Sequence, residues 1–184
     1  MTESSIGPTA AHCAILEVMA KSQVQIRRSR MEDAESLCDT INAVAREKWW
    51  LATVDGFSPE QTRSFLKFVM DHSLSQVVAV ESGLIVGWCD VVPKGPRGFS
   101  HVGALGMGVR REWRRQGVGR RLLEQCLGLA RAAKLEKIEL EVFTDNDGAI
   151  RLYEALGFVR EGEKSRARKL EGRYQDVLLM ALWL

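Results

Sequence analysis

The chain has 184 residues, of which 46% are hydrophobic and 27% charged, and its formal net charge is +2. This length suits one ordinary domain around one core, and the composition excludes a disordered or fibrous protein. The small net charge provides little long-range attraction for a polyanion, so we expect no nucleic acid partner.

The cysteines and the N-terminal segment indicate a compartment. Cys13, Cys38, Cys89 and Cys126 show neither zinc-ligand spacing nor the framework of a small secreted domain, so we expect reduced core cysteines and no metal site. No basic start and continuous apolar run of a secretory signal is present, and no stretch approaches the roughly 18 apolar residues of a membrane helix. We therefore expect a cytoplasmic protein without a membrane partner.

The chain is expected to begin with an extension at 1–22, partly helical or disordered, followed by a single domain over 23–184. A short strand is predicted at 24–28. Apolar residues then recur at helical spacing over 31–49, which predicts a first amphipathic helix.

Helix-capping and turn residues predict the next elements. Ser58 can cap a second helix that has Pro59 at its first position, and Gln61 completes a capping box. The runs QVVAV and LIVGWCDVV flank a turn at 81–83 and predict a β-hairpin.

The second half alternates strands and helices. We expect a strand over 101–109, a helix over 118–133, a strand over 137–143 and a helix over 147–156 that Gly157 ends. The tail over 159–183, with Glu171-Gly172-Arg173 at its centre, predicts a terminal hairpin. These elements together indicate one mixed α/β domain.

The stretch RRQGVGRRLL at 114–123 places Gly117 and Gly119 between a strand and a helix. A glycine loop that opens a helix presents unpaired backbone N–H groups at the positive end of that helix, which is an anion site. The loop is too short for the GxxxxGK[ST] nucleotide motif and lacks the third glycine of the dinucleotide fingerprint. The remaining interpretation is that the loop binds a pyrophosphate carried by a molecule other than these nucleotides.

Two joined motifs carry a family resemblance. GMGVRREWRRQGVGRRLL followed by LEVFTDNDGAIRLYEALGF resembles the GNAT superfamily of acetyl-CoA-dependent N-acetyltransferases over about residues 24–184. The first contains the R-x-x-G-x-G loop that starts at Arg114, and the second an N-x-x-A-I-x-L-Y-x-x-x-G-F block over 146–158. The resemblance implies an α/β fold with a central, mostly antiparallel sheet, a splayed parallel strand pair and flanking helices.

The resemblance also implies how acetyl-CoA is held. Backbone amides over 115–120 would bind the pyrophosphate, and the pantetheine arm would pair with the preceding strand, whose glycines at 103, 106 and 108 fit a bulge or a close backbone approach. The implied cofactor-binding residues are Met107, Gly108, Val109, Arg114, Arg115, Gln116, Gly117, Val118, Gly119, Arg120, Asn146, Ala149 and Tyr153.

Two residues are candidates for catalysis. Tyr153 matches the family tyrosine that protonates the coenzyme A sulfur, although a tyrosine packed on the helix face is the alternative. Glu141 lies in a segment similar to ribosomal-protein alanine acetyltransferases, where a glutamate acts as the base; the alternative is a solvated strand face. Asn146 can contact the cofactor, cap a helix, or do both.

Other residues have weaker arguments. An α-amine with a pKa of about 8 is partly neutral at pH 7, so water or a backbone carbonyl could replace a strong base. Further acid–base candidates are Glu81, Asp90 and His101. The acceptor pocket is expected to include Glu47, Trp49, Trp50 and Phe57, which could equally be core residues.

The resulting expectation is an N-acetyltransferase that moves the acetyl group of acetyl-CoA to a primary amine of a small molecule or amino-acid-like acceptor. A protein N-terminal acetyltransferase and a non-catalytic coenzyme A sensor are the alternatives. The resemblance also allows a homodimer through the terminal strands.

Overall fold

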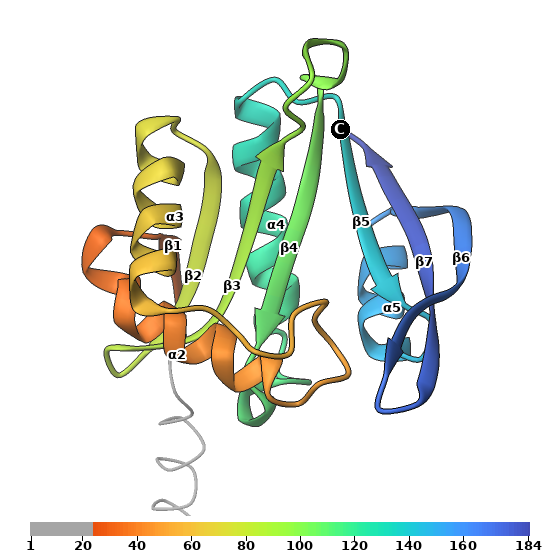
Figure 1. Cartoon of the computed structure of the whole chain (residues 1–184). Helices are drawn as coiled ribbons and strands as arrows, with labels where there is room; N and C mark the ends of the chain where they lie inside the picture. Colours follow the sequence, from red (N-terminus) through yellow and green to blue (C-terminus); the bar gives the residue numbers. More distant parts are fainter. Residues whose placement is uncertain (1–23) are drawn as a thin grey trace, which may run out of the picture.

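The structure is a computed structural model and describes residues 24–184. One mixed sheet forms the centre of this part of the chain (Figure 1). Its seven strands have the order β1-β2-β3-β4-β5-β7-β6. Helices α2 and α3 cover one face, and α4 and α5 cover the other (Figure 1). The expected extension at 1–22, which contains Cys13, lies outside the described residues.

The elements follow the predicted order. The strands are β1 (Gln25–Arg28), β2 (Ser75–Glu81), β3 (Leu84–Pro93), β4 (Val102–Val109), β5 (Lys137–Phe143), β6 (Val159–Leu170) and β7 (Arg173–Trp183). The helices are α2 (Ala34–Ala45), α3 (Pro59–Asp71), α4 (Val118–Ala132) and α5 (Asp147–Glu154), with short 3₁₀ turns η1 (Met31–Asp33), η2 (Arg97–Phe99) and η3 (Arg111–Trp113).

Strands β4 and β5 are the parallel pair of this otherwise antiparallel sheet. Their pairing covers only 102–104 with 137–139, after which they diverge toward their C-terminal ends (Figure 1). The GNAT-like fold with a splayed parallel pair is therefore confirmed. The expected bulge in β4 is wrong, because β4 pairs with β3 in continuous register from Gly103 to Val109.

The glycines of β4 instead allow close packing. A Cβ atom on Gly108 would lie 2.3 Å from the ring of Trp88, and one on Gly103 would lie 2.4 Å from a methyl group of Val91. Both distances are far below van der Waals contact, so only glycine fits against these buried side chains. These contacts are with side chains of the protein, and the close approach of a ligand to the β4 backbone stays a prediction.

Both predicted hairpins use turns that need positive φ at two successive residues. Ser82 and Gly83 have φ values of 49° and 83°, and Glu171 and Gly172 have 50° and 82°. This is the pattern of a type I′ turn, whose twist matches the twist of the paired strands. The turn residues thus set the register of each hairpin next to its turn, up to the register shifts farther along β2 and β6.

The helix ends also follow local chemistry, with one exception. Ser58 accepts a hydrogen bond from the N–H of Gln61 at 3.2 Å, and its own N–H donates to the Gln61 side chain at 2.8 Å, so the capping box is confirmed. Helix α2 stops at Ala45 and does not continue toward 49, because Lys48 has a φ of 68° that no α-helix can contain.

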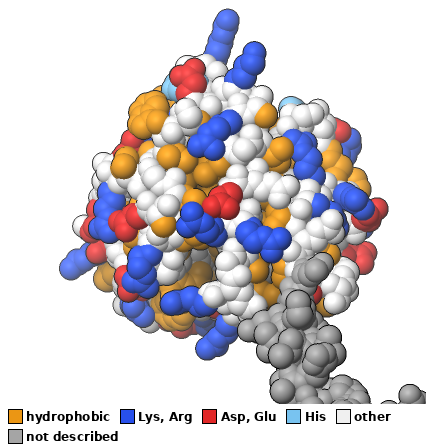
Figure 2. All heavy atoms as spheres, turned by 180° about the vertical axis from the view of Figure 1, so that it is seen from behind, with side chains coloured by type: hydrophobic (Ala, Val, Ile, Leu, Met, Phe, Trp, Pro, Cys, Tyr) orange, Lys and Arg blue, Asp and Glu red, His pale blue; other side chains and the backbone are white. Residues whose placement is uncertain are grey.

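Apolar side chains fill both sides of the sheet. One core lies between the sheet and α4 and α5, and the other between the sheet and α2 and α3. Cys38, Cys89 and Cys126 are buried free thiols, as expected. On the face covered by α4 and α5, Lys and Arg side chains are interspersed with acidic and hydrophobic ones (Figure 2).

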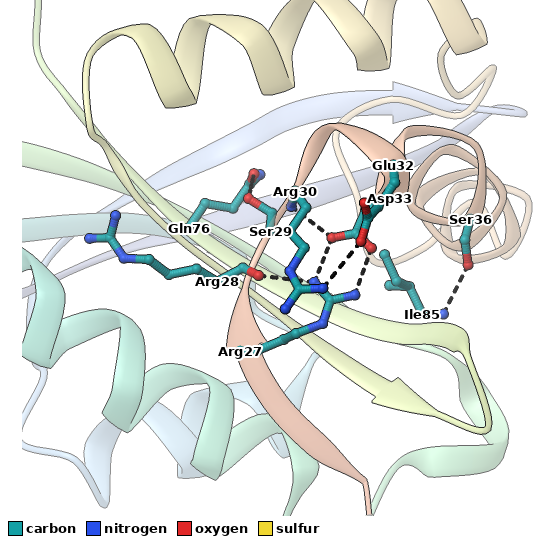
Figure 3. Close-up of polar contacts among 9 residues, drawn as sticks. All are labelled: Arg27, Arg28, Ser29, Arg30, Glu32, Asp33, Ser36, Gln76 and Ile85. Carbon is teal, nitrogen blue, oxygen red and sulfur yellow. Dashed lines mark hydrogen bonds and ion pairs between the residues drawn. The ribbon is translucent and has the colours of Figure 1, made fainter.

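A polar network joins β1 to the start of α2 (Figure 3). Arg27 donates to both carboxylate oxygens of Asp33 at 2.7 Å, and the N–H of Arg30 donates to Asp33 at 2.7 Å. Burial alone would raise the pKa of Asp33, but these hydrogen bonds outweigh it and hold the pKa below its ordinary value. Ser29 donates to Gln76 of β2 at 2.7 Å, which ties the same segment to the sheet.

Asp90 is half-buried and lies in β3 on the same sheet face as Trp88, which is the face that α2 and α3 cover. The side-chain nitrogen of Gln76, its partner in β2, is buried without a hydrogen-bond partner. Burial raises the pKa of Asp90 to about 7. The folded protein therefore keeps a proton that the unfolded chain releases near pH 4.

The Asp90→Asn variant should remove a pH dependence of stability. Between about pH 4 and pH 7 the folded state binds more protons than the unfolded state, so wild-type stability falls by up to about 1.4 kcal/mol per pH unit and levels off above pH 7. Urea denaturation of both proteins from pH 4 to pH 8 should show the wild type losing about 2–4 kcal/mol relative to the variant. A constant difference across this range would contradict the raised pKa.

Candidate active site

A cleft of about 1060 Å³ opens where β4 and β5 diverge. Its walls come from β4, the 114–120 loop, β5, α5 and the terminal hairpin. The connection between α2 and α3 reaches across the gap and contributes residues 50–52 (Figure 1). Because 105–109 of β4 has no partner in β5, one backbone edge of β4 faces this cleft.

The 114–120 loop forms the start of α4. Arg115 and Gly117 have positive φ values of 62° and 78°, and no side chain caps the first turn of the helix. Helices α3 and α5, in contrast, are capped by Ser58 and Asn146. The N–H groups that open α4 therefore have the arrangement that binds anions.

Gly119, in the first turn of α4, lies beside two other walls of the cleft. A Cβ atom on Gly119 would lie 3.4 Å from Leu152 of α5 and 3.6 Å from Met107 of β4. The first turn of α4 therefore packs between two other walls of the cleft. Its uncapped amides are held rigidly at the cleft rim.

Arg114, the first residue of the motif, points away from the loop amides. Its Nε donates to the carbonyl of Val109 at 2.7 Å, and its two Nη atoms donate to the Glu47 carboxylate, one of them at 2.8 Å. Glu47 also accepts from the Trp50 indole at 2.9 Å. Arg114 thus joins the loop that opens α4 to the connection after α2.

The structure brings most of the predicted cofactor residues to one cleft. Those that line it are Met107, Gly108, Val109, Arg114, Arg115, Gly117, Gly119, Arg120, Asn146, Ala149 and Tyr153. The side chains of Gln116 and Val118 do not line it: Gln116 donates to the carbonyl of Glu112 at 2.7 Å, and Val118 is buried in the core.

Tyr153 is both packed and exposed to the cleft. It is buried, its ring lies 5.7 Å from that of Phe158, and it lines the cleft. Burial, with a smaller contribution from the nearby Cys89, raises the pKa of Tyr153 above its ordinary value. The phenol therefore keeps its proton throughout the neutral pH range, as a proton donor must, although the raised pKa makes it a weaker acid than a solvated tyrosine.

Asn146 and Glu141 also line the cleft. The side-chain oxygen of Asn146 accepts from the N–H of Ala149 at 3.2 Å and caps α5, as expected. Glu141 is exposed and accepts a hydrogen bond from Lys164 at 2.6 Å. Glu141 therefore lines the cleft and also lies on a solvated strand face.

The other acid–base candidates lie away from the cleft walls. Glu81 accepts a hydrogen bond from the Trp113 indole, Asp90 lies beneath α2 and α3, and His101 precedes β4. None of the three is a lining residue.

Only some of the residues expected in the acceptor pocket lie at the cleft. Trp50 lines the cleft. Its indole donates directly to Glu47, which also accepts from Arg114. Trp49 stacks with Arg173, whose guanidinium lies 5.0 Å from its ring, and Phe57 is exposed outside the cleft. The prediction is therefore supported for Trp50 alone as a wall residue.

Sequence reasoning missed the cleft residues of the terminal hairpin. Arg168 lines the cleft, lies 4.1 Å from the ring centre of Phe143, and donates to the carbonyls of Lys48 and Leu51. No spacing in RARKL marks this arginine, because its position depends on pairing with β7. Over residues 24–184, no group of three or more His, Cys, Asp and Glu side chains could hold a metal ion, and no helix is long and apolar enough to span a membrane.

Comparison with known proteins identifies relatives of this chain. Residues 42–158 match the Acetyltransferase (GNAT) family model. The chain is 34% identical over 110 residues to the L-amino acid N-acetyltransferase AaaT of Escherichia coli K12, covering 59% of this chain and 67% of that protein. It is also 34% identical over 96 residues to the N-alpha-acetyltransferase RimI of Mycobacterium tuberculosis, covering 52% of this chain and 59% of that protein.

A solved structure shares the fold. YncA of Salmonella typhimurium, with acetyl-CoA bound, superposes with a TM-score of 0.82 at 19% identity and covers 87% of this chain and 93% of that one. The splayed strands, the uncapped start of α4 and the family match over 42–158 lead to one conclusion. The chain belongs to the GNAT family and is an acetyl-CoA-dependent N-acetyltransferase.

Proposed function

We propose that this enzyme transfers the acetyl group directly to the primary amine of a small molecule, an amino acid or an amino-acid-like compound. The observation that carries this proposal is the bonding of the 46–52 connection to the terminal hairpin beside the cleft. Lys48 forms an ion pair with Glu171 at the tip of the terminal hairpin, and Arg173 stacks on Trp49. These contacts, with those of Arg168, join the 46–52 connection to the terminal hairpin beside the cleft, which suits a small acceptor.

The cleft fits acetyl-CoA without a metal ion. The uncapped amides at the start of α4 suit its diphosphate, and the unpaired edge of β4 near Met107 and Val109 suits its amide-bearing arm. When bound, acetyl-CoA supplies an acetyl group activated as a thioester. Two of the arginine side chains in this loop are already engaged elsewhere, because Arg114 pairs with Glu47 and Arg120 with Glu124.

Two residues of the cleft supply the proton transfers. Tyr153 holds a proton on its hydroxyl and donates it to the departing sulfur. Glu141, or a water molecule beside it, accepts the proton that the attacking amine releases. An α-amine is partly neutral near pH 7, so this second transfer does not need a strong base.

Acetylation of a protein N-terminus is the second candidate, supported by the similarity to RimI of Mycobacterium tuberculosis. Purified enzyme should be incubated with labelled acetyl-CoA and either a pool of amine metabolites or a peptide library, and the products identified by mass spectrometry. We expect labelled small molecules. Label on peptides alone would overturn the small-molecule proposal, and label on neither despite coenzyme A binding would favour a sensor.

The Tyr153→Phe variant tests the proton donor. We expect kcat to fall by about 10²- to 10⁴-fold, because the only loss is the donated proton, while the Kd for coenzyme A measured by calorimetry stays within about 3-fold. Tyr174→Phe is the matched control, since Tyr174 is exposed and does not line the cleft. An unchanged kcat for Tyr153→Phe at every pH would remove Tyr153 from this role.

The Glu47→Gln variant tests the link between the two sides of the cleft. Glu47 and Arg114 are largely shielded from water, so loss of the charge should weaken both acetyl-CoA and acceptor binding by about 10-fold. The exposed Arg120–Glu124 pair provides the control, and Glu124→Gln should change either constant by less than about 2-fold. Calorimetry and steady-state KM values measure the two effects, and equal behaviour of the two variants would refute the link.

A further inference from the structure

Arg168 is placed in the cleft by an irregularity in β6. The register with β7 shifts between Lys164 and Arg168. Within this bulge Arg166 has a φ of 51°, and its N–H donates to the Asp176 carboxylate at 2.6 Å. A bulge re-aims the side chains that follow it, and here Arg168 becomes the direct partner of Gln175.

Neutral groups hold the Arg168 guanidinium in one orientation. Its Nε donates to the Gln175 side-chain oxygen at 2.9 Å, its Nη1 to the Leu51 carbonyl at 2.8 Å and its Nη2 to the Lys48 carbonyl at 2.7 Å. The ring of Phe143 covers one face of the group. Nη2 also donates to Gln175, so one N–H of Nη1 is left without a partner among the described residues.

No carboxylate of the described residues forms an ion pair with this cation, although Asp145 lies near enough to attract it. Glu141 accepts its hydrogen bond from Lys164, and Asp145 accepts from Arg173 at 3.1 Å and from Gln175 at 3.1 Å. Burial lowers the pKa of Arg168 below its ordinary value, although the group remains charged at neutral pH. A partly desolvated cation with neutral partners gains stability when an anionic ligand group binds beside it.

We infer that Arg168 binds the carboxylate of the acceptor, and that the acceptor is a free α-amino acid. This inference rests on the proposed acetyl transfer to a small amine. Phe143, beneath the guanidinium, lies two residues from Glu141 on the same face of β5, a span of about 7 Å. An amino acid carries its amine and carboxylate on one carbon, so a carboxylate at Arg168 holds the amine in this same part of the cleft, which Glu141 also lines. The N-terminal residue of a peptide has a neutral amide in place of that carboxylate.

Kinetics on matched acceptors test the inference. Free amino acids and their carboxamides should be compared as acceptors for the wild type and Arg168→Gln, at saturating acetyl-CoA and equal concentrations of neutral amine. We expect the wild type to favour each free acid over its carboxamide by about 10- to 100-fold in kcat/KM. The variant should lose this preference, because its KM for the acid should rise by about 10-fold more than its KM for the carboxamide.

The neighbouring residue provides a matched control. Lys169 is exposed and does not line the cleft, so Lys169→Gln removes a charge from the same strand and should retain the wild-type preference. Equal losses for acid and carboxamide in Arg168→Gln would show that Arg168 only holds the 48–51 segment, which overturns the inference.

The wild-type enzyme alone also provides a test, whether or not the variant folds. No preference for the free acid, or a preference for peptides with free N-termini, would overturn the role of Arg168 but leave acetyl transfer intact. Failure to acetylate any amine despite coenzyme A binding would instead overturn the proposed function on which the inference depends.

Discussion

The separation of β4 from β5 is the constraint on which the rest of the site depends. The two strands pair only over 102–104 and 137–139, so the remainder of β4 keeps one unsatisfied backbone edge. Unpaired N–H and C=O groups inside a protein must find partners, and a substrate arm can supply them. The same separation creates the cleft and places α4 and α5 at its two rims, which brings the loop at 114–120 and Tyr153 into one cavity.

The connection after α2 is the second determinant, because it is held from both sides of the cleft. Glu47 pairs with Arg114 beside the start of α4, and the carbonyls of Lys48 and Leu51 accept from Arg168 of the terminal hairpin. These bonds fix Trp50 and Leu51 as a wall of the cleft. A change on the cofactor side can therefore reach the acceptor side through a short chain of direct contacts, which is a physical route for coupling the two binding events.

Local chemistry made much of the fold predictable, and long-range pairing hid the rest. The Ser58 capping box, the type I′ turns and the loop with Gly117 each depend on a few adjacent residues, so their patterns are visible in the sequence. The end of α2 depends on contacts of 46–52 with distant strands, and the bulge before Arg168 depends on Asp176 of another strand. No neighbouring residue signals either feature, so the sequence does not predict that Arg168 lies in the cleft. Tyr153 and Asn146 are predictable because they lie in a motif of adjacent residues.

This difference follows from how the two ligands are recognised. A diphosphate is bound by main-chain N–H groups, which demand glycine and positive φ at fixed spacing and so leave a motif. An acceptor is recognised by side chains, and here they come from three segments that meet only after folding: the 46–52 connection, β5 and the terminal hairpin. Substitutions in the terminal hairpin can alter the acceptor without disturbing the strand divergence or the start of α4. A shared cofactor motif therefore fixes the reaction type, whereas the acceptor must be inferred from side-chain charge and geometry within the folded cleft.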